Sequence, residues 1–431
     1  MVEVFQKTMG HFFPSFLQWL RMVKDPREKS KIDYPLPNLV WVGILLFLLK
    51  LEARRQIKFR FNTAEFIHNL NLLTKVNLEK VAHPDTLEYL LEKLPPETLS
   101  HLRVKMVNRL IRMKCLEKFR LLGKYYLIAI DGTGHLVFNE RHCEHCLVQK
   151  KGGKVLYYYH NVLEAKLVTA NGLALSIATE FIENTGEEAD RQDCELRAFY
   201  RLVKQLKKDF PQLHICLLLD SLYAAGPVFT ICRNYHWQYL ITFKQGSMPE
   251  VYTEYLNLRP LYEETFRELK EGERRQNFNW VTGIDYQEHR LNVLECNESQ
   301  SGKESRRFVW LTNLAINQDN FQQIAKGGRL RWKTENEGFN TQKNGGYNLE
   351  HAYSEDEVAA KNFYLLLQIA HTINQLMEKG SLLKDQIKEF FGSIRNIARK
   401  LLEDLRTKFI DLDQLQRELA TPCQIRFLDS S

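Results

Sequence analysis

Two aspartates follow runs of apolar residues that predict buried strands. Asp131 closes the segment KYYLIAID (124–131), and Asp220 closes HICLLLD (214–220). Active sites of α/β sheets gather at strand ends, where loops leave the packed core, so the two carboxylates are expected to lie side by side. Like charges so close repel each other unless a divalent cation lies between them. Hard oxygen ligands select Mg²⁺ or Mn²⁺ for that place.

A third carboxylate would complete a site for two cations, of which one activates the attacking oxygen and the other stabilises the leaving oxygen. Taken singly, an Asp after a strand is more often a turn former or a helix cap. Two of them on two strand ends, in this order of elements, favour a shared catalytic site over that simpler interpretation.

The segments around the two aspartates predict a mixed α/β sheet. Residues 155–182 indicate two strands joined at Asn171-Gly172, a strong hairpin signal. A helix is expected over 194–210, then the strand that ends at Asp220, a helix around 227–235 and a strand over 238–244. This order predicts a sheet with helices on its faces.

The pattern along the chain divides it into five parts. Residues 1–122 are mostly helical in pattern, and 123–245 hold the strands and helices just described. Residues 246–313 break this rhythm with strand-like segments around a polar stretch, which predicts an inserted β-rich subdomain. Residues 314–380 are the remainder of the sheet domain, and 381–431 form an amphipathic helical tail.

Composition sets the broad class. The 431 residues carry a formal charge of +7, an excess too modest to separate a nucleic-acid binder from a basic enzyme. The longest apolar run, Leu39 to Leu49, is too short to cross a bilayer and predicts a buried helix. Eight cysteines without a secretory signal indicate a reducing compartment. We expect a cytoplasmic, nucleoid-associated protein of bacterial type that does not enter membranes.

Three segments resemble the motifs of DDE insertion-sequence transposases: IAIDGTG, LLLDSLYAAG and RWKTENEGFNTQK. The resemblance covers about 125–375 and is strongest to the cut-and-paste group whose third motif reads Tyr-x2-Arg-x3-Glu-x6-Lys. It implies a ribonuclease H-like core with a β-rich insertion before the last acid. It also implies that Asp131, Asp220 and Glu335 are the catalytic, metal-binding acids, with Mg²⁺ or Mn²⁺ as cofactor. Arg331 and Lys343 then take the basic, DNA-contacting positions.

Two departures from the family motif affect the third segment. Gly328 stands at the Tyr position, and Lys343 follows Glu335 by eight residues where the family has seven. At about 100° per residue, eight residues turn the Lys343 side chain about 80° away from Glu335. A one-residue π-bulge would restore the alignment. Alternatively Glu337 is the third acid, although the Arg-x3-Glu spacing favours Glu335.

The activity implied is that of a transposase. It cuts double-stranded DNA at the transposon ends and joins the ends to target DNA by two-metal-ion phosphodiester hydrolysis and transesterification. The resemblance also implies a homodimer that holds two DNA ends. Similar transposases free the second strand through a hairpin intermediate, and the resemblance implies the same step here. One alternative is a ribonuclease H-like, metal-dependent DNA nuclease without strand transfer. The other is a catalytically silent, transposase-derived DNA-binding protein, which the presence of all three acids disfavours.

Basic and aromatic residues supply further expectations. Arg329 and Lys333 flank the third motif and are expected to contact phosphate. The basic stretch from Arg103 to Lys124 is either a DNA-contacting or a solvated helix face, and the N-terminal region is the expected reader of the element's ends. Trp332 could stack on a displaced base, but a place in the core is favoured.

One cysteine-rich loop has the residues for a metal site. Cys143 and Cys146 have Cys-x2-Cys spacing between histidines, and His160 lies in the next strand. Zn²⁺ prefers four such ligands. No second Cys-x2-Cys pair follows to complete a common site, so a loop with reduced thiols is favoured over structural zinc.

Overall fold

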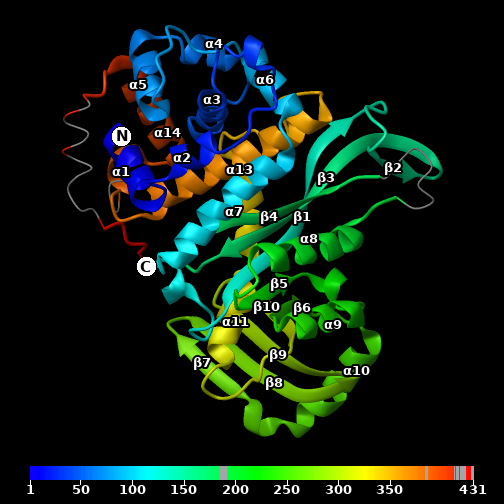
Figure 1. Cartoon of the computed structure of the whole chain (residues 1–431). Helices are drawn as coiled ribbons and strands as arrows, with labels where there is room; N and C mark the ends of the chain where they lie inside the picture. The colour runs from blue at the N-terminus through cyan, green and yellow to red at the C-terminus, as the bar shows by residue number, and fades with distance from the viewer. Residues whose placement is uncertain (185–191, 384–386, 412, 414–416, 418–423, 429–431) are drawn as a thin grey trace.

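A computed structural model describes residues 1–184, 192–383, 387–411, 413, 417 and 424–428. Within these residues, ten strands form one mixed sheet (Figure 1). The strands of the first half are β1 (Tyr126–Phe138), β2 (Leu147–Lys151), β3 (Lys154–Val168), β4 (Ala174–Ile182), β5 (Ile215–Leu219) and β6 (Gln238–Thr242). The strands of the second half are β7 (Arg267–Glu271), β8 (Arg274–Tyr286), β9 (His289–Gln300) and β10 (Lys303–Thr312).

Five neighbouring strands have the order β4-β3-β1-β5-β6. Strand β3 is antiparallel to β4 and to β1, whereas β1, β5 and β6 are parallel to one another. A strand hairpin followed by parallel strands is the order expected for a ribonuclease H-like core, and the predicted fold class is confirmed. The β3–β4 turn contains Gly172 at φ +88°, a conformation that glycine adopts readily.

The strands of the predicted β-rich insertion continue this same sheet. Strand β10 pairs with β6, so β10, β9, β8 and β7 extend the parallel edge of the core. One apolar cluster continues from the core strands onto the added ones and includes Phe278, Trp280 and Phe321, with the Trp280 and Phe321 rings stacked at 5.2 Å. The helix α11 (Phe321–Arg329) therefore rests on the added strands before the chain returns to the acid-bearing region.

Helices connect and cover the strands of the core. The helix α8 (Glu195–Asp209) packs on β3 and β4, α9 (Gly226–Tyr235) on β6 and β9, and α10 (Pro249–Leu258) on β8. Strand β1 is longer than its apolar run predicted, because its antiparallel pairing with β3 continues to Phe138. Asp131 therefore lies inside a strand and not at its end.

Apart from the short α12 (Thr341–Asn344), the remaining helices form one lobe around the long helix α13 (Glu357–Lys379) (Figure 1). It contains α1 (Val2–Phe12), α2 (Phe16–Arg21), α3 (Leu36–Leu48), α4 (Gln56–Arg60), α5 (Ala64–Thr74), α6 (Pro84–Lys93), α7 (Pro96–Arg112) and α14 (Ile394–Thr407). The two predicted helical flanks thus pack together, and the amino group of Met1 binds Asp404 at 2.9 Å.

The long apolar run forms the buried helix α3, as its length predicted. Helix α13 packs against α3, α6 and α7. In the part of the chain that the structure describes, no helix is both long and apolar enough to cross a membrane. Part of the predicted helical tail (384–386, 412, 414–416, 418–423 and 429–431) lies outside the described residues.

Candidate active site

The register of two parallel strands brings Asp131 and Asp220 to matched positions. Ala129 of β1 pairs with Leu218 of β5, and each aspartate lies two residues further along its chain. Residues two apart in a strand point to the same face, and neighbouring strands lie about 4.8 Å apart. Asp220 also accepts a 2.9 Å hydrogen bond from the amide of Leu222, so it caps a short turn while facing this cluster.

Arg331 and Glu335 approach the aspartates from the segment after α11. The Arg331 guanidinium donates to Asp131 Oδ2 at 3.1 Å, and its side chain is only 15% exposed. Glu335 lies at the start of a π-helix, Thr334–Asn340, which packs against β1. The π-helix stands where the extra residue between Glu335 and Lys343 falls, and its wider turn absorbs that residue.

The charges of the other two acids act on Asp131, and Glu335, whose side chain is exposed, has the smallest effect. Burial raises the pKa of Asp131, the Arg331 charge opposes this rise, and the charges of Asp220 and Glu335 add to it. Glu337 does not belong to this group. It pairs with Lys333 at 2.5 Å and lies beside Gly172 in the β3–β4 turn.

A fourth acid, Glu195, was not expected from the sequence. It is the first residue of α8, and burial followed by the charges of Asp131 and Asp220 raises its pKa. A Cβ atom at Gly132 would overlap the Glu195 carboxylate, so the glycine next to Asp131 leaves the space that this side chain fills. Tyr223 lies near the same acids, and within the described part of the chain its buried hydroxyl has no hydrogen-bond partner.

Buried polar contacts from β3 and α13 support the π-helix. Lys166 of β3 donates to Gln368 of α13 at 3.2 Å and lies over the Phe339 ring at 5.0 Å. Gln342, just past the π-helix, donates to Gln368 at 2.8 Å. A Cβ at Gly338 would come within 2.9 Å of the Lys166 side chain, so the π-helix and β3 are in close contact. These contacts fix the segment that carries Glu335.

The expected DNA-contacting residues all have carboxylate partners. Arg331 binds Asp131, as described, and Lys333 binds Glu337. The other two pairs are Arg329 with Glu298 at 2.6 Å and Lys343 with Glu350 at 2.9 Å. A DNA phosphate would therefore have to compete with a protein carboxylate at each of them.

The departure from the motif at Gly328 has a packing reason. A Cβ at this position would lie within 3 Å of three atoms of the Trp310 indole ring. Strand β10 thus fills the space with Trp310, and no tyrosine side chain fits there without moving that strand.

Two expectations about single residues are wrong. Trp332 was expected in the core, but it is 54% exposed and lies beside the Arg331 guanidinium at 5.1 Å. Arg103, counted in a basic helix face, is 2% exposed and hydrogen-bonds Ser176 at 2.8 Å. Its charge faces the buried carboxylate of Glu164, so Arg103 holds α7 to the sheet and is not available to DNA.

The chemistry of the cluster fits divalent cations. Its donors are carboxylate oxygens, which Mg²⁺ and Mn²⁺ prefer, and the mutual repulsion that raises two of the pKa values would be offset by positive charge. Among the described residues, ligand atoms within 4.8 Å of one another occur in a group of three only at Cys143, Cys146 and His160. The acids do not form such a group, so their side chains would have to move closer together to share an ion.

The sequence matches no family model and no curated protein. Among solved structures, the piggyBac transposase synaptic complex with hairpin DNA, determined by cryo-electron microscopy, is similar at a TM-score of 0.40 and 13% identity. The similarity covers 96% of this chain and 84% of that one. At this level the similarity carries no weight for function, which has to be argued from the residues of the acid cluster.

Proposed function

We propose that this chain is a metal-dependent DNA transposase whose catalytic acids are Asp131, Asp220 and Glu335. The observation that carries the proposal is the meeting of residues far apart in sequence. Two aspartates occupy matched places on neighbouring strands, and the electrostatic influence of Glu335 reaches Asp131. An acid cluster of this kind on a ribonuclease H-like sheet suits phosphodiester cleavage and joining with Mg²⁺ or Mn²⁺, which would polarise the phosphate and the attacking oxygen.

The protein's own residues would position and stabilise the reacting groups. The Arg331 guanidinium donates to Asp131. If Asp131 bound a metal ion, Arg331 would be released from this carboxylate and would be free to bind the phosphate oxygens. Trp332 presents an exposed ring beside Arg331 on which an unpaired base could stack. Arg329, Lys333 and Lys343 would contact the flanking backbone after exchanging their carboxylate partners for phosphate.

Glu195 extends the set of acids beyond the three expected. Its side chain fills the space beside Gly132, and its charge acts on both aspartates. We assign it a positioning role: it would orient water beside the two aspartates. A homodimer holding two DNA ends is proposed with the same activity, since both ends must be cut together.

The test is cleavage and joining of DNA that carries the inverted repeats flanking the gene. With Mg²⁺ or Mn²⁺, the wild type should release 3′-hydroxyl ends and join them to a target plasmid. Changing Asp131 or Asp220 to Asn, or Glu335 to Gln, should lower the rate about 10³-fold or more, because each change removes several kcal/mol of charge stabilisation.

Two further variants sharpen this test. Glu337→Gln should retain activity, because Glu337 pairs with Lys333 away from the aspartates. Asp285→Asn is a matched control on the exposed part of β8. Cleavage without joining would favour the nuclease alternative, and full activity of Asp131→Asn would end the proposal.

A further inference from the structure

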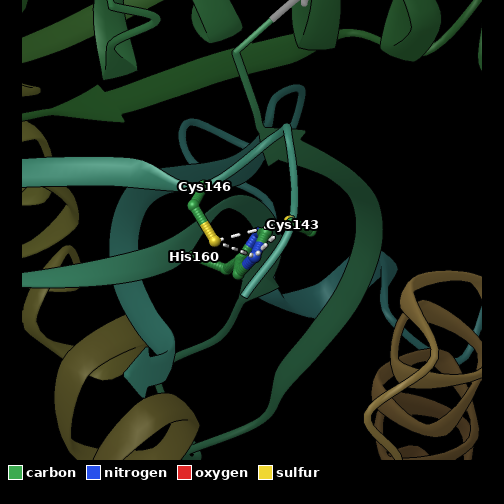
Figure 2. A group of neighbouring side chains, drawn as sticks. All are labelled: Cys143, Cys146 and His160. Carbon is green, nitrogen blue, oxygen red and sulfur yellow. Dashed lines mark hydrogen bonds between the residues drawn. The ribbon is translucent and has the colours of Figure 1, made fainter. Parts of the chain in front are cut away.

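Two cysteines and a histidine meet outside the acid cluster. Cys143 and Cys146 lie in the loop between β1 and β2, and His160 lies on β3 (Figure 2). The two Sγ atoms are 3.4 Å apart, and His160 Nε2 lies 3.3 Å from Cys143 Sγ and 3.4 Å from Cys146 Sγ. The three atoms form a nearly equilateral triangle.

The size of this triangle is close to one face of a zinc tetrahedron. Zinc binds thiolate sulfur at about 2.3 Å and imidazole nitrogen at about 2.0–2.1 Å, so the sulfur–sulfur and sulfur–nitrogen edges of a tetrahedral site are about 3.5–3.8 Å long. The observed edges of 3.3–3.4 Å are slightly shorter, so the three side chains would move slightly apart around the ion. Thiols are weak hydrogen-bond donors and acceptors, so contacts among them alone give little reason to converge.

A fourth ligand is available from a different part of the chain. Glu357, the first residue of α13, is a hydrogen-bond partner of the Cys143 thiol, although its carboxylate also faces His145 at 3.7 Å. It lies outside the group of ligand atoms within 4.8 Å of one another, so its side chain would have to turn from His145 toward the triangle to complete the site. A cavity of about 20 Å³ is lined by His142, His160 and Glu357, among others, so these side chains face a common space. His142 is less suited, because its Nε2 is bound to the Glu355 carbonyl at 2.7 Å.

We propose that Cys143, Cys146, His160 and Glu357 form a structural zinc site. Four protein ligands would close the coordination shell, which distinguishes a structural site from a catalytic one. Binding would release the two thiol protons to solvent and leave two thiolates, a neutral imidazole and a carboxylate on the ion. The ion would tie the β1–β2 loop to β3 and to the start of α13. The site does not depend on the proposed function, since none of its ligands belongs to the acid cluster.

The experiment measures metal bound to the full-length chain. Protein expressed in zinc-supplemented medium and purified under reducing conditions should contain about one zinc per chain by mass spectrometry. Cys143→Ser and Cys146→Ser should each lose most of this zinc. Cys115→Ser is the matched control, because Cys115 is also a partly buried free cysteine and its thiol donates to the Leu110 carbonyl at 3.3 Å. It should keep the full zinc content.

A second measurement covers the case in which a serine variant fails to fold. Wild-type protein stripped by a chelator should unfold about 5 °C or more below the zinc-loaded protein, and added zinc should restore the midpoint. Cobalt in place of zinc should give the thiolate charge-transfer bands and strong visible absorption of a tetrahedral site.

Three outcomes would overturn the proposal. The first is a folded wild-type protein that binds neither zinc nor cobalt. The second is a Cys143–Cys146 disulfide, with no metal bound, in protein purified under reducing conditions. The third is equal zinc content in the wild type and both serine variants. Weakened zinc binding in Glu357→Gln but not in His142→Ala would support the assignment of the fourth ligand, and the reverse would overturn that assignment.

Discussion

Lys166 offers a quantitative test of how the π-helix is supported. Burial lowers the pKa of this lysine from its ordinary value of 10.5 to about 8, although Glu164 favours the charged form. A difference of about 2.5 pH units at about 1.4 kcal/mol each makes the charged lysine cost roughly 3 kcal/mol at pH 7. Lys166→Met removes this cost and loses one hydrogen bond, to Gln368, worth about 1 kcal/mol. The variant should therefore be about 2 kcal/mol more stable at pH 7.

The lowered pKa of Lys166 also determines whether the stability of the wild type rises or falls with pH. Between pH 8 and 10.5 the unfolded lysine binds a proton that the folded one does not, so the stability of the wild type rises with pH in that window. The cost is fully present below pH 8 and is relieved as the pH rises. From pH 7 to pH 9.5 the wild type should gain about 2 kcal/mol relative to Lys166→Met, which brings the two close together.

Urea unfolding followed by tryptophan fluorescence at the two pH values measures this gain. Lys151→Met, on the exposed end of β2, is the matched control and should show no such change relative to the wild type. A stability difference between wild type and Lys166→Met that is the same at pH 7 and pH 9.5 would refute the reasoning, because Lys166 would then titrate alike in both states.

Three other predictions concern the site and its supports. Gly132→Ala should leave folding almost intact but displace Glu195 and slow DNA cleavage, whereas an unchanged rate would remove Glu195 from the account. Arg103→Met removes the ion-pair partner of the buried Glu164 carboxylate and should cost about 3–5 kcal/mol in chemical denaturation, and a loss below 1 kcal/mol would contradict this. Trp332→Ala should weaken binding of end DNA with unpaired bases by about 1–3 kcal/mol in fluorescence titrations but leave fully paired DNA unaffected.

Short sequence patterns correctly predicted two strands, a hairpin turn and the π-helix. The apolar runs before Asp131 and Asp220 form β1 and β5, and the Asn171-Gly172 turn joins β3 to β4. The spacing anomaly in the third motif pointed to a π-bulge, and a π-helix covers Thr334–Asn340. Such features follow from periodicity and turn chemistry over a few residues.

The positions of Glu195, Arg103 and Trp332 depend on tertiary contacts that short sequence patterns do not reveal. Glu195 joins the acids from a helix start 64 residues after Asp131, and only the missing side chain of Gly132 hints at it. Arg103 shares a helix face with Leu99 and Met106, which are buried, so its burial follows from helical spacing once the face is known. Trp332 is exposed because Arg331, its neighbour, takes the inward position toward Asp131.

The most direct test of the acid cluster is a crystal structure of the chain grown with Mn²⁺ and recorded for anomalous scattering. We expect manganese within about 2 Å of carboxylate oxygens from both Asp131 and Asp220, with Glu335 drawn toward it and Arg331 released from Asp131. Manganese bound only elsewhere, with the Arg331–Asp131 ion pair intact at saturating Mn²⁺, would contradict the account.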